Sequence, residues 1–504
     1  MSGTGQPRVR RNEWQTLAPP ALGSWTPTLA VSVVVPAYDA GRLLPSVLAG
    51  LAAQTYPAHL LEVVVVDDGP GRLELPEVRP DNTRIVRVDQ GWGRANACHT
   101  GAMAADGDVL HWLDADMLTE RHEVEAQARW HHLLDHTVVL GDKWFVDPDP
   151  VLALDPAAVR DLVRTDGVAG LYAGRDRQPH AWVEEIYART DRLRLAGWNA
   201  LRTHAGATAS VGRDLYLDSG GLDTTLRLGE DIALGARLGA AGAVFVPDAE
   251  ALSWHLGHTH VMARREAVNA YNDPFLADAA PVLRAKRRPG RTYAEPYLEI
   301  VLDTRGHDPE AVTATVDAVL ASTLHDLTVT LLGDWATLHD GRAAVLDDAS
   351  LPTRVVHTTY AADPRVTLLE RLPPTRSRAA FRAVLPGTAW APRPPALEKN
   401  LLHLEHTHEG LRLVDLPDGS VVRIERTAAY ARAQRLAQAG EDLDAVVDAI
   451  AGSRRLEGPR AGFGPSERVR PGHYPRTGGP PLDPDEAWAR IDKALGTRTG
   501  GPIA

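Results

Sequence analysis

Val109-Leu110-His111-Trp112-Leu113-Asp114-Ala115-Asp116-Met117 is the stretch on which the interpretation of the whole chain depends. Apolar side chains dominate its first half, and two carboxylates follow with one alanine between them. This pattern predicts a buried strand of an α/β sheet with both carboxylates at its C-terminal end, where open α/β sheets bind ligands. An extended backbone places Asp114 and Asp116 on the same side, so they repel each other unless a cation lies between them.

A simpler interpretation makes Asp116 the cap of a helix near residues 119–134.

The sequence before Asp116 contains a repeated alternation of strand and helix patterns. Apolar segments at residues 30–35, 62–66 and 83–88 alternate with stretches in which apolar residues recur at helical spacing. Such alternation predicts a mostly parallel sheet, with functional residues at the places where its strands end.

Composition limits the kind of protein. The 504 residues are too many for one ordinary core, so two or three domains are expected. The apolar share of 44% and the charged share of 24% are typical of a soluble globular protein, and the net charge of -12 argues against a nucleic-acid binder. Cys98 is the single cysteine, which excludes a disulfide framework and a cysteine-rich zinc site.

Targeting signals are not recognisable in the sequence. No apolar run approaches the roughly 18–20 residues that a membrane span requires, and residues 1–27 lack the apolar centre of a signal peptide. We therefore expect a cytoplasmic protein without a transmembrane span. Peripheral contact with the inner face of the membrane and a homo-oligomeric state are both compatible with the sequence.

Seven short segments, taken together, resemble the family 2 glycosyltransferases of the GT-A fold, of the bacterial type. The resemblance covers roughly residues 29–265, about half of the chain. In chain order, it is carried by residues 31–38 (Val-Ser-Val-Val-Val-Pro-Ala-Tyr), residues 63–69 with Asp67-Asp68, residues 113–116, residues 206–210, Gly220-Gly221-Leu222-Asp223, Gly229-Glu230-Asp231 and Trp254-His255.

This resemblance implies transfer of a sugar from a nucleotide-sugar donor to a hydroxyl of a glycan, glycolipid or cell-wall polymer, with inversion. It implies that Asp68 hydrogen-bonds the nucleobase, and that Pro36, Ala37 and Tyr38 flank the base and ribose. Arg94 is a candidate contact for the base or diphosphate. Its surroundings differ from the Ala-Arg-Asn-x-Gly sequence that is usual in the family.

A divalent metal is the predicted cofactor, because a hard cation held by carboxylate oxygen neutralises the charge of a leaving diphosphate. Asp116 is the predicted direct ligand, and Asp114 is predicted to contact the ribose hydroxyls or the ion's waters. His255 resembles the late histidine that completes the metal site in the family, and imidazole suits Mn²⁺ better than Mg²⁺. His258 is the second choice of ligand and His260 the weakest. A zinc site of these histidines alone would lack a recognised catalytic spacing.

The acceptor side is predicted from the middle of the chain. Residues 147–200, with a helical stretch near residues 182–195, are expected to form one wall of the acceptor site. Residues 206–210 and Arg213 resemble the loop that passes beneath the transferred sugar. The resemblance makes Asp231 the general base and gives Glu230 an orienting role. The simpler alternative is that both carboxylates only stabilise a helix N-terminus.

The second half repeats the first strand–helix–strand pattern at residues 297–303, 312–320 and 326–332. Residues 382–388 then stand where residues 112–116 stand in the first half, without metal-binding carboxylates. We therefore predict a degenerate, non-catalytic GT-A-like second α/β domain. An unrelated α/β domain is the alternative.

The predicted organisation has four parts. It consists of an N-terminal extension lying over the first domain or disordered (1–28), the catalytic domain (29–275), the degenerate repeat (290–430), and a C-terminal helix near residues 430–450 with a flexible tail (431–504). Residues 452–482 are rich in Arg, Gly and Pro, which predicts a linker. His131, His132 and the histidines of residues 403–408 are expected at the surface.

Two other functions compete with glycosyl transfer. A non-catalytic nucleotide-sugar or glycan-binding protein on the same fold would have no need for a base such as Asp231. A dinucleotide-dependent oxidoreductase would require Gly-x-Gly-x-x-Gly after the first strand, and residues 36–41 do not supply it.

Overall fold

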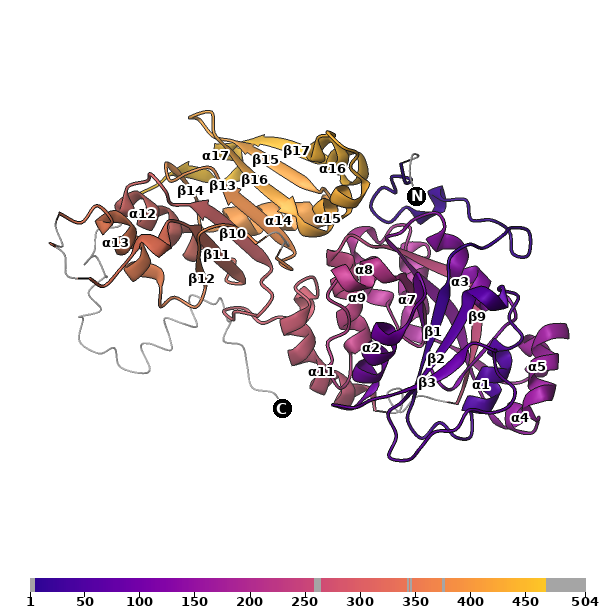
Figure 1. Cartoon of the computed structure of the whole chain (residues 1–504). Helices are drawn as coiled ribbons and strands as arrows, with labels where there is room; N and C mark the ends of the chain where they lie inside the picture. Colours follow the sequence, from indigo (N-terminus) through magenta and orange to yellow (C-terminus); the bar gives the residue numbers. More distant parts are fainter. Residues whose placement is uncertain (1–4, 258–263, 342–343, 345–346, 374–376, 468–504) are drawn as a thin grey trace, which may run out of the picture.

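A computed structural model of the chain describes residues 5–257, 264–341, 344, 347–373 and 377–467. Figure 1 shows two β-sheets, each covered by helices and each formed by a different half of the sequence. The first sheet has nine strands in the order β3-β2-β1-β4-β8-β6-β9-β5, with β7 paired to β6. The second has seven strands in the order β12-β11-β10-β13-β16-β15-β17.

The elements of the first sheet follow the predicted alternation of strands and helices. Its strands are β1 (Val31–Ala37), β2 (Leu61–Asp67), β3 (Thr83–Arg87), β4 (Val109–Leu113), β5 (Met117–Thr119), β6 (Thr137–Val146), β7 (Arg177–Pro179), β8 (Thr208–Gly212) and β9 (Val244–Leu256). The helices are α1 (Leu44–Leu51), α2 (Arg94–Ala104), α3 (Glu123–His131), α4 (Asp149–Leu152), α5 (Pro156–Thr165), α6 (Val168–Leu171), α7 (Ala181–Thr190), α8 (Arg213–Asp218), α9 (Glu230–Ala240) and α11 (Arg265–Ala279).

Burial on both faces explains why the central strands contain long apolar runs. Strand β1 pairs in parallel with β2 on one side and with β4 on the other. One face of these strands packs against α2 and α9, and the other packs against α1 and α3. Parallel strands covered on both faces are apolar at nearly every position, which is the pattern of residues 31–35 and 109–113.

Asp116 does not cap a helix, so the simpler interpretation of this residue is wrong. The short strand β5 follows it and pairs antiparallel with the end of β9, Met117 opposite His255. Helix α3 begins only at Glu123. This pairing brings two segments that are far apart in the sequence to one edge of the sheet.

The second sheet repeats the strand order of the first. The second half of the chain contains β10 (Leu298–Asp303), α12 (Pro309–Leu320), β11 (Leu327–Leu332), α13 (Leu351–Tyr360), β12 (Val366–Leu369), β13 (Phe381–Leu385), β14 (Trp390–Pro392), α14 (Ala396–Thr407), β15 (Leu411–Asp415), β16 (Val421–Arg426), α15 (Thr427–Leu436), α16 (Leu443–Ala451), β17 (Ser453–Glu457), α17 (Gly458–Ala461) and β18 (Phe463–Pro465). Strands β14 and β18 pair with each other in a separate two-stranded sheet. The prediction of a mostly parallel first sheet followed by a second α/β domain is confirmed.

The hydrogen-bond ladders align the two sheets residue by residue. Strand β10 pairs in parallel with β11 and β13, as β1 does with β2 and β4, and β13 pairs antiparallel with β16, as β4 does with β8. Val31 pairs with Leu61 and Val109, and Leu298 pairs with Leu327 and Phe381. Counting along the chain from these pairs defines equivalent positions in the two sheets.

The C-terminal part of the second sheet differs from the prediction. The single helix expected near residues 430–450 is two helices, α15 and α16, separated by a turn in which Gly440 has φ 82°. Residues 453–457, expected in a flexible linker, form β17, which pairs with β15 at the sheet edge. An exposed edge strand is polar and rich in arginine, so its composition resembles that of a linker. Residues 468–504 lie outside the described residues.

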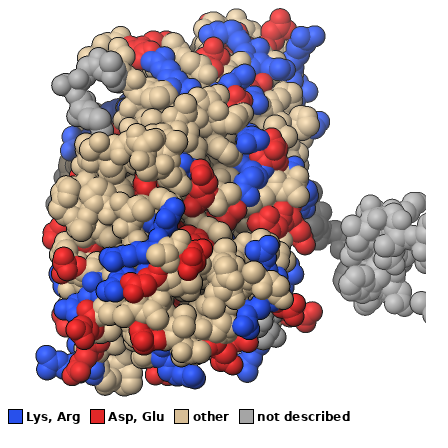
Figure 2. Space-filling view, turned by 90° about the vertical axis from the view of Figure 1, so that its right-hand side faces the viewer, with Lys and Arg blue, Asp and Glu red and all other residues tan. Residues whose placement is uncertain are grey.

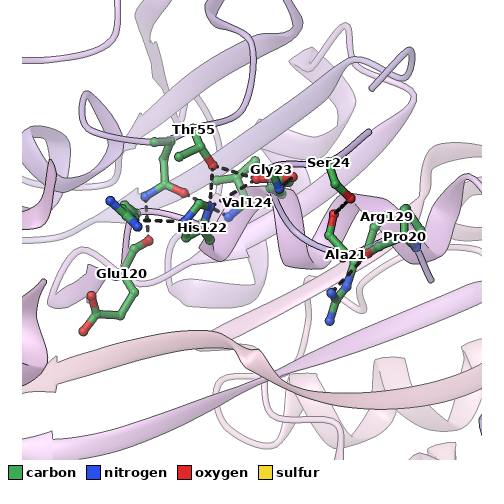
Figure 3. A network of polar contacts seen from close by, with 12 residues as sticks. Pro20, Ala21, Gly23, Ser24, Thr55, Glu120, His122, Val124 and Arg129 are labelled. Atoms are coloured by element: carbon green, nitrogen blue, oxygen red, sulfur yellow. Dashed lines mark hydrogen bonds and ion pairs between the residues drawn. The ribbon is translucent and has the colours of Figure 1, made fainter. Parts of the chain in front are cut away.

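The N-terminal segment lies over the first sheet. Val9, Trp14 and Leu17 are buried against α3, β6 and β9. Polar contacts attach its next part to α3: Gly23 N–H donates to Glu125 Oε1 at 2.6 Å, and Arg129 Nη1 donates to the carbonyl of Pro20 at 3.4 Å (Figure 3). This segment is thus packed against α3, β6 and β9.

A buried arginine connects the two halves of the chain. Arg432 on α15 donates hydrogen bonds to the carbonyls of Gly242 and Ala243 beside β9, both at 2.7 Å, and to the carbonyl of Val9 at 3.2 Å. Burial lowers the pKa of Arg432 to about 9. Because its guanidinium group meets carbonyl groups from two other segments, this side chain ties the N-terminal segment and the first sheet to α15.

The surface shows no dominant sign of charge on the face drawn in Figure 2, where acidic and basic side chains are interspersed. Within the described parts of the chain, none of the helices has the length and apolarity needed to span a membrane.

Candidate active site

Side chains from the ends of β4 and β9 and from the start of α9 meet at one edge of the first sheet. Arg94, the first residue of α2, connects the end of β4 to the start of α9. Its Nε and Nη2 donate to Asp114 Oδ1 at 2.9 and 2.7 Å, and its Nη1 donates to Glu230 Oε1 at 3.0 Å. Nη2 also donates to the carbonyl of Gly206 at 2.6 Å. Burial lowers the pKa of Arg94, but the neighbouring carboxylates outweigh burial and raise it overall.

Asp116 and His255 form the second part of the site. His255 Nε2 lies 3.6 Å from Asp116 Oδ2, and the His255 ring packs on Phe145 with centroids 4.7 Å apart. Asp116 Oδ1 and His255 Nδ1 are buried and have no hydrogen-bond partner among the described residues. Burial raises the pKa of Asp116, against the opposing effect of His255. A carboxylate oxygen and an imidazole nitrogen are thus held side by side.

Asp68 and Asp67 have different environments although they are adjacent. Asp67 is buried and accepts hydrogen bonds from Gly69 N–H at 3.1 Å and Arg87 Nη1 at 2.8 Å, which gives it a structural role. Asp68 Oδ2 accepts from Gly93 N–H at 2.8 Å, just before α2. Asp68 therefore orients the loop that precedes Arg94.

One exposed aromatic side chain lies in this loop, and another follows β1. Tyr38, which follows β1, is 71% exposed, whereas Pro36 is half-buried and Ala37 is buried within β1. Trp92 is 62% exposed, and the guanidinium carbon of Arg227 lies 4.3 Å from its ring centroid. Trp92 was not predicted as a site residue. The sequence feature that could have indicated this residue is its position between two glycines, Gly91 and Gly93. In the structure both glycines have positive φ.

Glu230 and Asp231 begin helix α9, as predicted. Glu230 is buried, and its pKa is raised by burial and by the carboxylate of Asp231. Asp231 Oδ1 accepts from Ile232 N–H at 2.8 Å, and Oδ2 accepts from Gly206 N–H at 3.4 Å. His204 Nδ1 donates to the backbone carbonyl of Asp231 at 2.7 Å. Gly206 thus contacts both Arg94 and Asp231.

Part of the predicted acceptor loop lies elsewhere. Residues Thr208–Gly212 form strand β8, which runs antiparallel to β4 with Thr208 beside Leu113 and Gly212 beside Val109. Residues 206 and 207, which precede β8, lie at the site: Gly206 contacts Arg94 and Asp231, and Asp114 N–H donates to the carbonyl of Ala207 at 3.1 Å. Arg213 lies at the opposite end of the strand, where its Nη1 donates to the carbonyl of Ala102 at 3.2 Å, so its assignment to this loop is wrong.

A further correction concerns His131, and two other predicted histidines are not described by the structure. His131 is buried rather than at the surface, with Nε2 2.8 Å from Ser210 Oγ, because α3 turns this side chain toward the sheet. His258 and His260, the weaker ligand candidates, lie outside the described residues. Across the described residues, no cluster of three or more His, Cys, Asp or Glu side chains has the arrangement of a metal site.

Lys143 and His180 were not selected from the sequence but lie close to the site. Both line a small pocket between β6 and α7. Burial lowers the pKa of Lys143, while Asp114, Asp142 and Asp231 raise it. No sequence motif marks Lys143, because only the fold brings β6 beside the ends of β4 and α9.

Comparison with known sequences shows which family one segment of the chain resembles. Residues 32–153 match the sequence model of the family Glycosyl transferase family 2. This segment contains β1 to β6 and, within them, Asp68, Arg94, Asp114 and Asp116. Over this segment the chain is similar to glycosyl transferase family 2.

Individual relatives agree with this family. Glycosyltransferase AglE of Haloferax volcanii is 34% identical over 91 residues, which cover 17% of this chain and 30% of that protein. Validoxylamine A glucosyltransferase of Streptomyces hygroscopicus subsp. limoneus is 34% identical over 149 residues, 28% of this chain and 32% of that protein. The chain spans between 20% and 40% of the length of the first three curated relatives.

Among solved structures, mannosyltransferase PcManGT from Pyrobaculum calidifontis, in complex with GDP-Man and Mn²⁺, overlaps 54% of this chain and 67% of its own. The identity is 18% and the TM-score is 0.35.

Proposed function

We propose that the first sheet catalyses transfer of a sugar from a nucleotide-sugar donor to the hydroxyl of a glycan, glycolipid or cell-wall polymer, with inversion. The observation that carries this proposal is the pair Asp116–His255, which lies beside Asp114 and close to the start of α9. Asp116 retains a buried oxygen without a hydrogen-bond partner among the described residues, and such a group is costly unless a ligand satisfies it. The family match over residues 32–153 supports glycosyl transfer as the reaction.

The residues present fit a divalent cation that is shared with the donor. Asp116 and His255 offer one carboxylate and one imidazole, and such cations commonly combine one or two protein ligands with substrate phosphates. The imidazole favours Mn²⁺ over Mg²⁺. When bound, the ion would supply positive charge for the leaving diphosphate. Asp114 is less suited as a direct ligand because Arg94 already occupies one of its oxygens.

The remaining side chains are assigned to donor binding, to activation of the acceptor or to positioning of α9. Tyr38, Pro36 and Ala37 would flank the base and ribose, and Asp68 would contact the base while it holds the loop at Gly93. Asp231 would accept the proton of the attacking hydroxyl. Glu230 and Arg94 would keep α9 in position against β4, because Arg94 bonds both Glu230 and Asp114.

Release of nucleoside diphosphate from a panel of nucleotide sugars tests this proposal. We expect turnover with Mn²⁺, loss of turnover in excess chelator, and loss in Asp116→Asn. Thr388→Val, the same position in the second sheet, is the matched control and should behave as wild type. Full turnover in chelator would contradict the metal proposal. Tight donor binding without any turnover or transfer would instead favour a nucleotide-sugar-binding protein.

A further inference from the structure

A strongly basic segment lies outside the candidate active site. Residues 284–291 (Arg-Ala-Lys-Arg-Arg-Pro-Gly-Arg) carry five cationic side chains and no carboxylate, although the whole chain has a net charge of -12. The segment follows α11 and precedes β10, so it joins the part of the chain that forms the first sheet to the second sheet (Figure 1). Positive charge gathered in this way raises the local concentration of anions.

Part of the basic segment lines a cavity of about 130 Å³. One water molecule needs about 10–15 Å³ on the same measure, so the cavity has room for a small ligand. Arg284, Arg287 and Arg288 line one side of it. Residues 323–326, which precede β11, and Glu398 on α14 line the other.

Arg287 fixes the basic side of the cavity in place. Its side chain is 4% exposed, and Nη1 donates to the two oxygens of Asp326 at 3.0 and 2.8 Å. Nη2 donates to the carbonyl of Glu295 at 2.6 Å, and the guanidinium carbon lies 4.5 Å from the centroid of the Tyr293 ring. Asp326 thus offsets the charge of Arg287, and this pair is a fixed part of the wall.

Arg284 and Arg288 keep donors for a ligand. The guanidinium carbon of Arg284 lies 4.1 Å from the centroid of the Tyr297 ring, and its Nη1 is buried without a hydrogen-bond partner among the described residues. Arg288 is exposed. Lys286 and Arg287 are paired with carboxylates, whereas in the described parts of the chain Arg284 and Arg288 are not. Guanidinium groups pair with phosphate through two parallel hydrogen bonds.

The opposite side of the cavity determines which anion is suitable. Glu398 Oε2 accepts from Thr323 Oγ1 at 2.7 Å. A carboxylate repels an anion without a proton, but it accepts a hydrogen bond from an anion that retains one. Three arginines and two carboxylates leave a net charge of about +1 in the lining, which matches a singly charged anion. Sulfate has two charges and no proton, whereas a protonated phosphate group has one charge and a hydroxyl group.

We propose that this cavity binds a phosphate group that retains a proton, either inorganic phosphate or a phosphate monoester. Arg284 and Arg288 bind its unprotonated oxygens, and Glu398 accepts a hydrogen bond from its hydroxyl group. None of the residues that line the cavity belongs to the candidate active site. The ligand therefore occupies a second site, between the basic segment and the second sheet.

Calorimetric titration with inorganic phosphate at pH 6.5, without metal or nucleotide sugar, tests the site. We expect one saturable site, with affinity about 10- to 100-fold lower in Arg284→Met and in Arg288→Met, the effect of losing hydrogen bonds between charged groups. Arg291→Met changes the same basic segment outside the cavity lining and should match wild type, as should Asp116→Asn in the candidate active site. No binding by wild type, or unchanged binding in both cavity variants, would overturn the proposal.

Sulfate separates the role of Glu398 from attraction by charge alone. Wild type should bind phosphate at least about tenfold more tightly than sulfate, because only phosphate can donate to the carboxylate. Glu398→Gln replaces a repelling oxygen by an amide that can donate, so it should remove most of this preference. Equal affinity of wild type for the two anions would contradict the proposed site.

The source of the phosphate group is tested with soluble and lipid monoesters. Glycerol phosphate is titrated as the soluble probe, and phosphatidylcholine vesicles carry either phosphatidic acid, a monoester, or phosphatidylglycerol, a diester. Cosedimentation with phosphatidic acid alone, displaced by inorganic phosphate, would support the proposal with a lipid headgroup as ligand. Binding of inorganic phosphate or glycerol phosphate without cosedimentation would support it with a soluble ligand. Equal cosedimentation with both vesicles, unchanged in Arg284→Met, would overturn it.

Discussion

The two sheets of this protein share a strand order but differ at the strand ends. Counting from the aligned ladders, Thr388 takes the place of Asp116, and Ser466 takes the place of His255. Asp334 is at the position of Asp68, and Leu416 is at that of Lys143. The buried apolar positions that define the fold are present in both sheets, whereas the predicted metal ligands and the predicted acceptor wall occur in one. We therefore assign the proposed function to the strand-end residues rather than to the topology.

The equivalent strand ends of the two sheets also differ in hydrogen bonding. In the second sheet, Thr315 Oγ1 donates to the carbonyl of Thr388 at 3.0 Å and lies 3.1 Å from Ser466 Oγ. In the first, Asp116 Oδ1 and His255 Nδ1 are buried without partners among the described residues. Leaving buried polar groups unpaired costs stability, on the order of 1–3 kcal/mol for each group. The first sheet keeps groups that a ligand can satisfy, and the second satisfies its own.

Substitution of the proposed base should have the largest effect. Asp231→Asn keeps the size of the side chain but cannot accept the acceptor's proton, so transfer should fall by a factor on the order of 10² to 10⁴. Donor affinity should change little. A donor titration, a thermal melt and a transfer assay on one purified variant check this. Near wild-type transfer with a lowered Tm would reduce Asp231 to a helix-capping role.

Loss of the Arg432 contacts, which join α15 to the first sheet and the N-terminal segment, should have the next largest effect. Arg432→Met removes the donors that bond the carbonyls of Val9, Gly242 and Ala243, and we expect a loss of about 3 kcal/mol in the free energy of unfolding. Urea unfolding, compared with an exposed control such as Arg288→Met, measures this loss. Unchanged stability would mean that the sheets associate through their apolar contacts alone.

Acid should destabilise the first sheet through His131. Burial lowers the pKa of His131 to about 3, below the ordinary value of 6.5. The unfolded chain therefore takes up this proton first, so the contribution to stability is complete above pH 6.5 and is lost as the pH falls toward 3. The loss should reach about 2 kcal/mol at pH 5. Unfolding of wild type and His131→Gln between pH 5 and 8 checks the slope, and identical slopes would contradict this account.

Asp68 at the end of β2 and Asp334, its equivalent at the end of β11, should show the smallest effects of substitution. Asp68→Asn should raise the donor KM by about tenfold, because it weakens both the base contact and the bond to Gly93. Asp334→Asn, at the equivalent exposed position, should leave turnover unchanged and alter stability by less than about 0.5 kcal/mol. Equal effects of the two substitutions would indicate a second donor site.

Sequence patterns predicted the buried strands well and the polar edges poorly. The valine-rich strands β1, β2 and β4 were predicted within a few residues because burial on both faces leaves a continuous apolar run. Strand β17 was missed because an exposed edge strand needs no apolar face. Lys143 and His131 were missed for a different reason: their surroundings come from segments distant in the sequence, which no local pattern records.

For the candidate site, the resemblance indicated the residues but not the contacts between them. The resemblance marked Asp114, Asp116, Glu230, Asp231 and His255, and the structure places all of them at one sheet edge. It did not foresee that Arg94 bonds Asp114 and Glu230 together, because ion pairing depends on side-chain geometry. The roles of these residues in donor, metal and acceptor binding stay predictions.

Calorimetric titration with the nucleotide sugar that is turned over, in the presence of Mn²⁺, tests most directly whether the first sheet alone holds the donor site. We predict one binding site per chain in wild type, none in Asp116→Asn, and one in Thr388→Val. Two sites in wild type, or undiminished binding in Asp116→Asn, would contradict the division of roles between the two sheets.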